Sequence, residues 1–155
     1  MAVWARTHEE VVEAFAAGWR HPDPHAWDEL LADDVDLRQP FLRKGHGRDL
    51  WQQEAQRLLT FLPDARSEVL GWAGRTDMVF IEIRIDATLA GRPSSFQAID
   101  RLRIDSTGLV LQRDSFFDPG PVALTVVRRP SAWWPWWRSG LGPLLVRRRF
   151  LKELS

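Results

Sequence analysis

The sequence contains no cysteine and no tyrosine, and the absence of cysteine excludes several kinds of chemistry. Disulfides, thiolate metal ligands and thiol nucleophiles are all ruled out, which agrees with a reducing interior compartment. No run approaches the ~18 apolar residues of a membrane span, and the N-terminal MAVWARTHEE lacks the apolar stretch of a secretory signal. We therefore expect a cytoplasmic protein.

Signals for a nucleotide or a metal are also lacking. The segment GHGRD has no Lys-Ser/Thr pair and follows no long buried strand, so it does not predict a phosphate loop. His21 and His25 flank two prolines that prevent one continuous helical face, and their spacing does not predict a metal site. We predict no cofactor and no metal.

The composition is that of one ordinary globular domain with a distinct tail. The 155 residues are 45% apolar and 27% charged, which is enough chain to bury one core. Residues 128–155 carry seven basic residues and one acid, a net charge of +6, and the other residues carry −6. We expect a domain over residues 1–127 and a basic, tryptophan-rich tail over 128–155.

Helical periodicity predicts three helices in the first half. Thr7 and Glu10 have the spacing of a capping box, and apolar residues then recur at helical intervals, which predicts a helix over about residues 7–20. HPDPHAWDELL predicts a turn and a short second helix. A third helix is predicted over about residues 48–61, where Pro63 ends it.

The second half has the period of strands. A short strand is predicted at 35–37, closed by Pro40. Short turns with Gly, Asp and Ser then separate four strand-like segments, which are residues 65–73, 78–88, 95–104 and 109–117. These spacings favour an antiparallel meander. Helices followed by a curled sheet predict the α+β class, with three helices on the concave face.

The segment IEIRID, residues 81–86, divides into two faces. Ile81, Ile83 and Ile85 share one face, whereas Glu82, Arg84 and Asp86 share the other. The charged face either meets water, where cross-strand ion pairs are ordinary, or lines a site. Alternation alone leaves both interpretations open.

The order of segments, the turn DDVDLRQPFLRKGHGRD and the closing DSTGLVLQRDSFFDP resemble the nuclear transport factor 2-like superfamily, often called SnoaL-like, over residues 7–119. The resemblance implies a cone-shaped, curved antiparallel sheet covered by three N-terminal helices, with a mostly apolar pocket inside. Members include ketosteroid isomerase, scytalone dehydratase, polyketide cyclase and limonene epoxide hydrolase, so the fold alone does not define the chemistry.

The motifs match the limonene epoxide hydrolases most closely. Arg84-Ile85-Asp86 is similar to their Arg-x-Asp, and the run that begins Arg113-Asp114 is similar to their Arg-Asp-aromatic-Phe-Asp with one extra residue. The resemblance implies that Asp114, Arg84 and Asp86 form a catalytic constellation. Asp114 would take a proton from the attacking water, and Asp86 would protonate the epoxide oxygen.

The chain departs from these enzymes where they hold the water with a Tyr and an Asn. Alignment on the GRD of residues 47–49 places Leu37 and Gln39 there; Gln39 can replace the amide, but Leu37 cannot replace the hydroxyl. The predicted contacts with substrate or water are Gln39, Leu37, Phe15, Trp19, Phe96 and Phe116.

These observations predict a cofactor-free acid/base enzyme that acts on a small apolar, oxygen-bearing substrate, with epoxide hydration as the leading hypothesis. A polyketide cyclase or isomerase that uses Asp114 alone is the second hypothesis. A non-catalytic module that binds an apolar molecule is the third, and the missing tyrosine together with Leu37 keeps it as an alternative.

Partners are also predicted. The resemblance implies a homodimer through the outer face of the sheet, for which Ile81, Ile83 and Ile85 are suitable if they point outward. The tail, 128–155, holds four of the nine tryptophans, interleaved with arginine. It is expected to pack on the domain or a second copy, or to contact a membrane surface peripherally. Nucleic acid is not expected, because the acidic remainder repels phosphate.

Overall fold

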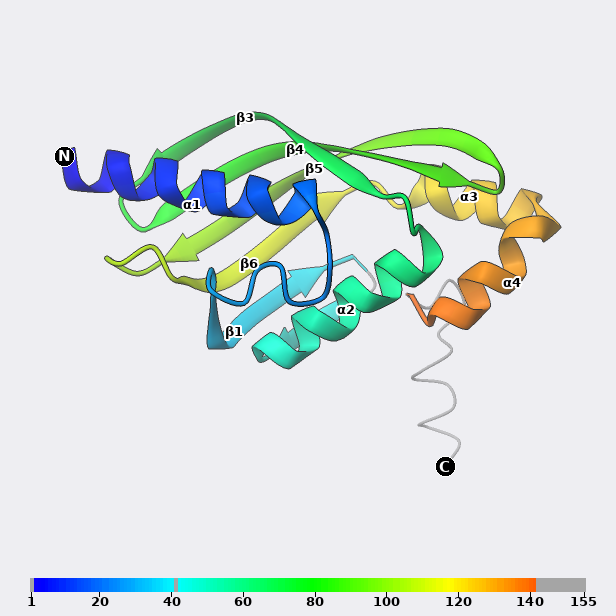
Figure 1. The fold of residues 1–155 in the computed structure, drawn as a ribbon, viewed down its shortest axis with the longest axis horizontal. Coiled ribbons are helices and arrows are strands. Elements are labelled where there is room, and N and C mark those ends of the chain that lie inside the picture. The colour runs from blue at the N-terminus through cyan, green and yellow to red at the C-terminus, as the bar shows by residue number, and fades with distance from the viewer. Residues whose placement is uncertain (1, 41, 142–155) are drawn as a thin grey trace.

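The computed structural model describes residues 2–40 and 42–141, where four helices accompany a curved six-stranded sheet (Figure 1). The elements in chain order are α1 (Ala2–Arg20), β1 (Leu31–Gln39), β2 (Leu42–His46), α2 (Arg48–Phe61), β3 (Arg66–Arg75), β4 (Met78–Leu89), β5 (Arg92–Ile104), β6 (Val110–Phe117), α3 (Gly120–Arg128) and α4 (Pro130–Ser139). The predicted α+β class is confirmed.

The sheet has the strand order β2-β1-β6-β5-β4-β3 and does not close into a barrel. Strands β3 to β6 pair as consecutive antiparallel neighbours, which confirms the predicted meander. Strand β1 joins β6 in parallel, with Leu37 opposite Arg113, and β2 forms the edge. The sheet is therefore mixed.

Helix α1 begins at Ala2, earlier than the predicted residue 7. Trp4 packs against the core and stacks on His8, with 5.9 Å between the ring centroids, and this packing extends the helix toward the N-terminus. Thr7 is buried inside the helix, so its spacing to Glu10 does not mark an N-cap.

The predicted second helix is wrong, because residues 24–30 form successive turns. Ala26 N donates to Asp23 O at 3.2 Å, and Asp28 N donates to His25 O at 3.1 Å. Three-residue bonds of this kind close tight turns but do not build an α-helix. The turns carry Trp27 into the core beneath α1.

The third predicted helix and the four main strands are confirmed within a few residues at their ends. The strand predicted at 35–37 is longer, Leu31–Gln39, because β6 supplies a parallel partner along it. Strand β2 was missed because LRKGH has no alternating pattern.

The main core lies between the sheet and helices α1 and α2. Val79, Ile81 and Ile83 are fully buried in it, together with Phe15 and Trp19 of α1. The isoleucines of IEIRID therefore point inward. The condition on which they were suitable for a dimer contact, an outward-pointing face, is therefore not met, and the homodimer itself stays a prediction.

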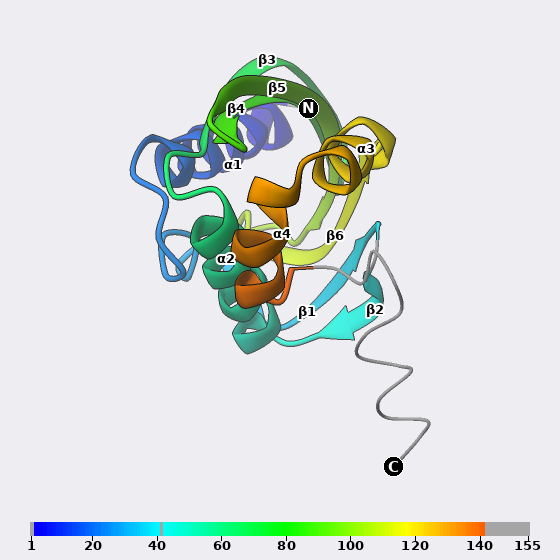
Figure 2. The same cartoon turned by 90° about the vertical axis from the view of Figure 1, so that its right-hand side faces the viewer.

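A smaller core joins α3 and α4 to the end of the sheet. Its buried residues are Phe61, Leu62, Ala65, Ala87, Leu89, Val126 and Ala132. Figure 2 shows α4 beside α2 at this end of the molecule. The described part of the tail thus packs on the domain, whereas the division at 127/128 stays a prediction and residues 142–155 lie outside the description.

No helix in the described ranges 2–40 and 42–141 is long and apolar enough to cross a membrane. Cytoplasmic location stays an expectation from the sequence.

Candidate functional site

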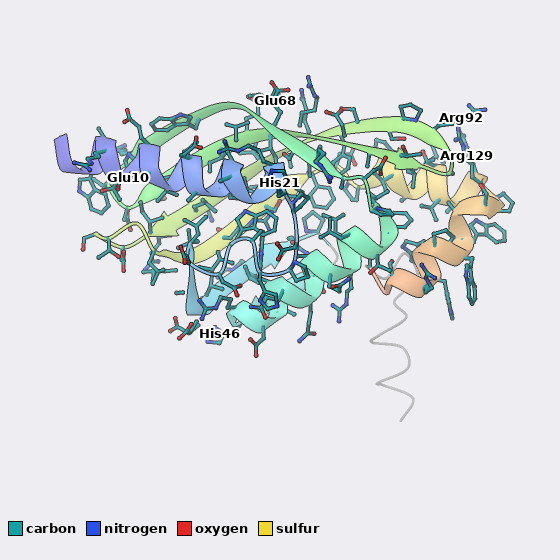
Figure 3. The ribbon with its side chains drawn as sticks, in the orientation of Figure 1. Glu10, His21, His46, Glu68, Arg92 and Arg129 are labelled. Carbon is teal, nitrogen blue, oxygen red and sulfur yellow. The ribbon has the colours of Figure 1, made fainter. Side chains whose placement is uncertain are left out.

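Arg84 and Asp86 lie on the outer face of the sheet. Arg84 Nε donates to Asp86 Oδ2 at 3.1 Å and Arg84 Nη2 donates to Glu68 Oε2 at 2.6 Å, with the Arg84 and Asp86 side chains 43% and 50% exposed. Glu68, labelled in Figure 3, marks this outer side, away from α2. The prediction that these charges line the interior is wrong, because the helices cover the isoleucine face.

The surroundings of Asp86 also disfavour its predicted role as a proton donor. Hydrogen bonds from Ser95 and Arg84 lower the pKa of the Asp86 carboxyl from its usual value. A carboxyl with a lowered pKa holds no proton at neutral pH and has none to give to an epoxide oxygen.

Asp114 is buried on the outer face under a different arginine. Its Oδ2 accepts bonds from Arg101 Nε at 3.0 Å and Nη2 at 2.6 Å, and from Gln112 Nε2 at 2.9 Å. Its Oδ1 lies 3.8 Å from Arg38 Nε. Asp114 therefore pairs with Arg101 and Arg38, and the predicted constellation does not come together.

A bulge in β6 explains why the residues after Leu111 lie on the opposite face from the one that simple alternation from Val110 predicts. The β5–β6 register shifts between Arg103 and Ile104, so that Val110 pairs with Ile104 and Gln112 with Arg103. Leu111 is the extra residue, and beyond it the alternation is displaced by one. Val110 and Arg113 are consequently both buried on the inner face, although simple alternation separates them.

The structure brings together an unpredicted pair, Asp100 and Arg113, on the inner face. Asp100 is fully buried, and Arg113 is nearly so. Arg113 Nε donates to Asp100 Oδ2 at 2.9 Å, and Arg113 Nη2 donates to Asp100 Oδ1 at 3.1 Å. A two-pronged guanidinium–carboxylate pair fixes both groups in a defined orientation.

Two further side chains hold the guanidinium of Arg113. Its Nη1 donates to Gln39 Oε1 at 3.3 Å, and its Cζ lies 4.5 Å from the centre of the Trp51 ring. The guanidinium is thus positioned by the Trp51 ring of α2, the Gln39 amide of β1 and the Asp100 carboxylate of β5. The bond to Gln39 uses one hydrogen of Nη1, and the bond to Asp100 uses one hydrogen of Nη2. Each of these two nitrogens carries a second hydrogen that can be donated.

Three tryptophans form an aromatic wall beside this pair. Trp19 and Trp27 meet edge to face at 5.2 Å, and Trp27 meets Trp51 at the same distance. Trp27 Nε1 donates to Phe15 O, but Trp19 Nε1 and Trp51 Nε1 are buried without a hydrogen-bond partner among the described residues. Unsatisfied buried donors are uncommon in folded proteins and are a candidate point of ligand contact.

The other predicted contact residues divide between the two faces. Leu37, Phe15 and Trp19 are buried in the main core, and Phe96 packs on the inner side against Phe117 with 6.2 Å between their ring centres. Phe116 is 55% exposed on the outer face, so its predicted contact with an interior substrate is wrong. The roles of the inward residues stay predictions.

A signal for the missed pair is present in the sequence. Asp100 alternates with Ala98, Leu102 and Ile104, so it is a charge on an otherwise apolar face of β5. Such a placement predicts a buried and paired carboxylate. Arg113 has no comparable signal, because the bulge hides its face.

A separate groove of about 490 Å³ lies between the end of α2, the β4–β5 turn and α4. Thr60, Thr88, Ser131 and Arg138 supply polar groups to it, and Phe61 and Leu89 supply apolar surface. Groups of three or more His, Asp or Glu side chains that could hold a metal do not occur in residues 2–40 and 42–141.

A curved sheet with helices on its concave face is the arrangement that this chain shares with solved structures of ketosteroid isomerase-like fold. The sequence profile described as "SnoaL-like domain" matches residues 12–112, which is about two thirds of the chain. The chain therefore belongs to the SnoaL-like family.

Solved structures share the fold at low sequence identity. A protein from Jannaschia described as a candidate SnoaL-like polyketide cyclase has a TM-score of 0.71 at 13% identity, and the match covers 81% of this chain and 94% of that protein. A protein of ketosteroid isomerase-like fold from Catenulispora acidiphila, in complex with trimethylamine, has a TM-score of 0.68 at 20% identity. The match covers 80% of this chain and 96% of that protein.

IdmH from Streptomyces antibioticus, described as a candidate polyketide cyclase, has a TM-score of 0.68 at 16% identity and covers 77% of this chain and 98% of its own. Comparison with curated proteins found no match. At these identities the structural likeness establishes the fold and leaves the chemistry to the site.

Proposed function

We propose that the protein is a cofactor-free acid/base enzyme of the polyketide cyclase or isomerase type, acting on a small apolar substrate that carries a carbonyl group. The observation that supports this proposal is the buried Asp100–Arg113 pair on the helix-covered face. A buried ion pair is less stable than apolar residues of the same volume, so a site explains its presence better than a scaffold does.

The proposed chemistry uses the two members of the pair in different roles. Asp100 accepts a proton from the carbon beside the substrate carbonyl. The second hydrogens on Nη1 and Nη2 of Arg113 bind the oxygen on which negative charge develops. The resulting enolate either attacks a second carbonyl carbon, which closes a ring and leaves an alkoxide that takes the proton back from Asp100, or takes the proton back from Asp100 at another carbon, which isomerises the substrate.

The apolar surroundings support such a step. Trp51 covers the guanidinium, and the indole N–H groups of Trp19 and Trp51 are donors for substrate oxygens. In surroundings of low dielectric constant, hydrogen bonds and charges stabilise an enolate more strongly than they do in water.

Epoxide hydration remains as an alternative reaction of the same pair, but not of Arg84, Asp86 and Asp114, because Arg84 pairs with Asp86 on the outer face while Asp114 pairs with Arg101. In that case Asp100 would take a proton from the water that attacks the ring carbon, Arg113 would stabilise the ring oxygen as its C–O bond breaks, and Asp100 would return the proton to that oxygen. Diol formation from terpene epoxides would favour this alternative.

The test is solvent-deuterium incorporation into a panel of apolar 1,3-dicarbonyl compounds, followed by mass spectrometry. We expect the wild type to exchange protons beside the carbonyl and Asp100→Asn to lower kcat by about 10²-fold or more. Asp114→Asn is the matched control, since it removes another buried, arginine-paired carboxylate on the opposite face. Its turnover should stay close to that of the wild type.

Thermal unfolding of each variant separates a loss of chemistry from a loss of structure. Equal turnover in Asp100→Asn and the wild type would remove Asp100 as the base. If no compound or epoxide reacts while lipophilic molecules still quench tryptophan fluorescence, the protein is the binding module that the sequence left open.

A further inference from the structure

Helix α4 has two faces of opposite character. Ala132 and Ser139 are buried at its base, and Ala132 contacts the small core that includes Phe61. Trp133, Trp134 and Trp137 are 53%, 69% and 50% exposed. These three residues recur at the intervals of one helical face, so the helix presents large aromatic side chains to its surroundings.

Helix α3 continues this apolar surface. Leu124 and Val127 are exposed and lie three residues apart on one face of α3. Trp133 Nε1 donates to Val126 O at 2.8 Å, which ties the first turn of α4 to the end of α3 beside Val127. The "tryptophan surface" is defined here as Leu124, Val127, Trp133, Trp134 and Trp137.

The charged side chains of α3, α4 and the residue between them have one sign. No acidic residue occurs between Asp118 and Glu153, whereas Arg128, Arg129 and Arg138 lie on or between the two helices. Figure 3 shows Arg129 at the end of the molecule opposite Glu10. Exposed apolar patches with a rim of polar residues mark interaction sites, and the charged residues that the two helices and their junction supply here are all arginines.

We propose that the tryptophan surface docks on an anionic lipid bilayer. Tryptophan prefers the level of the lipid headgroups, where its ring is buried and its N–H group is solvated. Arginine side chains at the same depth are attracted by anionic headgroups. The short helix would lie in the plane of the interface and not cross it.

A second copy of the chain fits this surface less well. A two-fold contact through it would bring the arginines of one copy toward those of the other, with no acid in this segment to pair with them. Docking on lipid removes this repulsion. It would also place the groove lined by Ser131 and Arg138 of α4 next to the bilayer.

The test is flotation of the full-length chain with vesicles of phosphatidylcholine and phosphatidylglycerol in equal parts, compared with phosphatidylcholine alone. We expect the wild type to float with the anionic vesicles and Trp134→Ala to bind about tenfold more weakly. Trp72→Ala is the matched control, because Trp72 is an exposed tryptophan on β3, outside this surface.

A second variant tests the charge independently of the aromatic rings. Arg128→Gln with Arg129→Gln should weaken binding by about fivefold for each charge removed, and added salt should do the same. Arg75→Gln, an exposed arginine of β3, is its control. The unfolding temperature of each variant verifies that the fold is unchanged.

Three outcomes would overturn the proposal. The wild type could stay at the bottom of the gradient with anionic vesicles, or Trp72→Ala could weaken binding as much as Trp134→Ala does. A concentration-dependent dimer that Trp134→Ala abolishes, without any vesicle binding, would assign the surface to a second copy.

Discussion

At the residue scale, the contact of Gly18 with Trp27 shows how closely α1 approaches the turns that follow it. A Cβ atom built on Gly18 would lie 2.3 Å from Trp27 Nε1. The Trp27 ring has no room to retreat, because it packs edge to face against Trp19 and Trp51. Glycine is therefore required here for space, and its backbone lies within a regular helix.

We predict that Gly18→Ala destabilises the protein by about 2 kcal/mol through overpacking, despite the better helix propensity of alanine. Gly71→Ala is the matched control, because a Cβ there meets no atom within 4 Å. It should change the free energy of unfolding by less than about 0.5 kcal/mol. Urea unfolding followed by circular dichroism measures both, and equal effects would contradict the role given to Trp27.

The buried ion pair is also a residue-scale feature. Arg113 and Asp100 form hydrogen bonds to each other in surroundings that are otherwise apolar, so each charge is compensated by its partner. Removing one member of such a pair leaves an uncompensated buried charge, at a cost of about 3–5 kcal/mol. Stability must therefore be measured beside turnover for every variant of this pair.

At the scale of elements, Asp64 connects the end of α2 to strand β4. Its two carboxylate oxygens each lie 3.0 Å from Thr88 N, from which they accept hydrogen bonds. The Thr88 side chain also bonds to Asp64, and these bonds lower the pKa of the Asp64 carboxyl. The Asp64 carboxylate therefore binds a proton less readily in the folded state than in the unfolded state.

This linkage predicts a loss of stability in acid. The contribution of Asp64 is present above pH ~4, the usual carboxyl pKa, and is lost as the pH falls through the lowered value. Because the group is exposed, we expect Asp64→Asn to remove only about 1 kcal/mol at neutral pH. It should also flatten the pH dependence of unfolding below pH ~4 relative to the wild type.

Asp34→Asn, which changes an exposed carboxyl of β1, is the control. If urea unfolding of both variants follows the same curve between neutral and acid pH, Asp64 does not carry this linkage.

At the scale of the whole molecule, α4 buries two of its ten residues, Ala132 and Ser139. Ala132 is its most buried residue and lies in the core that Phe61, Leu62 and Val126 form. A charge at this position has no partner and cannot reach water without moving the helix.

We predict that Ala132→Asp releases α4 while the sheet stays folded. Amides of residues 130–139 should exchange with deuterium faster, and those of β4 and β5 should remain protected. Ser131→Asp, at an exposed neighbouring position, should leave the exchange of α4 unchanged. Faster exchange throughout the sheet in Ala132→Asp would show that α4 is part of the main folding unit.

The opposite charges of the domain and its tail also belong to this scale. The tail carries +6 and the remainder −6, so the net charge is zero but the charges are unevenly distributed along the sequence. A surface of one sign orients a protein toward a partner of the other sign. In the described part of the tail the charged residues are Arg128, Arg129 and Arg138, which agrees with docking of α3 and α4 on an anionic surface.

Much of the fold could be predicted from local patterns. The helical period of residues 48–61 and the two-residue period of the four strands depend only on neighbouring side chains. The turn Thr76-Asp77 and the turn Ala90-Gly91 each include a residue with positive φ, and both were indicated by composition. Edge strand β2 has no such pattern and was missed.

The candidate site could be predicted only in part. Gln39, Leu37, Phe15 and Trp19 were expected inside and lie there, whereas Arg84, Asp86, Asp114 and Phe116 were expected inside and lie on the outer face. Alternation shows which residues share a face, but it does not show which face the helices cover.

The sequence by itself determined the α+β class, the meander and the basic, tryptophan-rich character of the tail, because these follow from composition and short-range period. Only the tertiary structure decided that the isoleucines of β4 point inward and that Asp100 meets Arg113. The isoleucines point inward because α1 and α2 cover that face of the sheet, and alternation alone does not show which face is covered. Asp100 meets Arg113 because one extra residue, Leu111, displaces the alternation of β6, and that displacement exists only in the pairing of two strands.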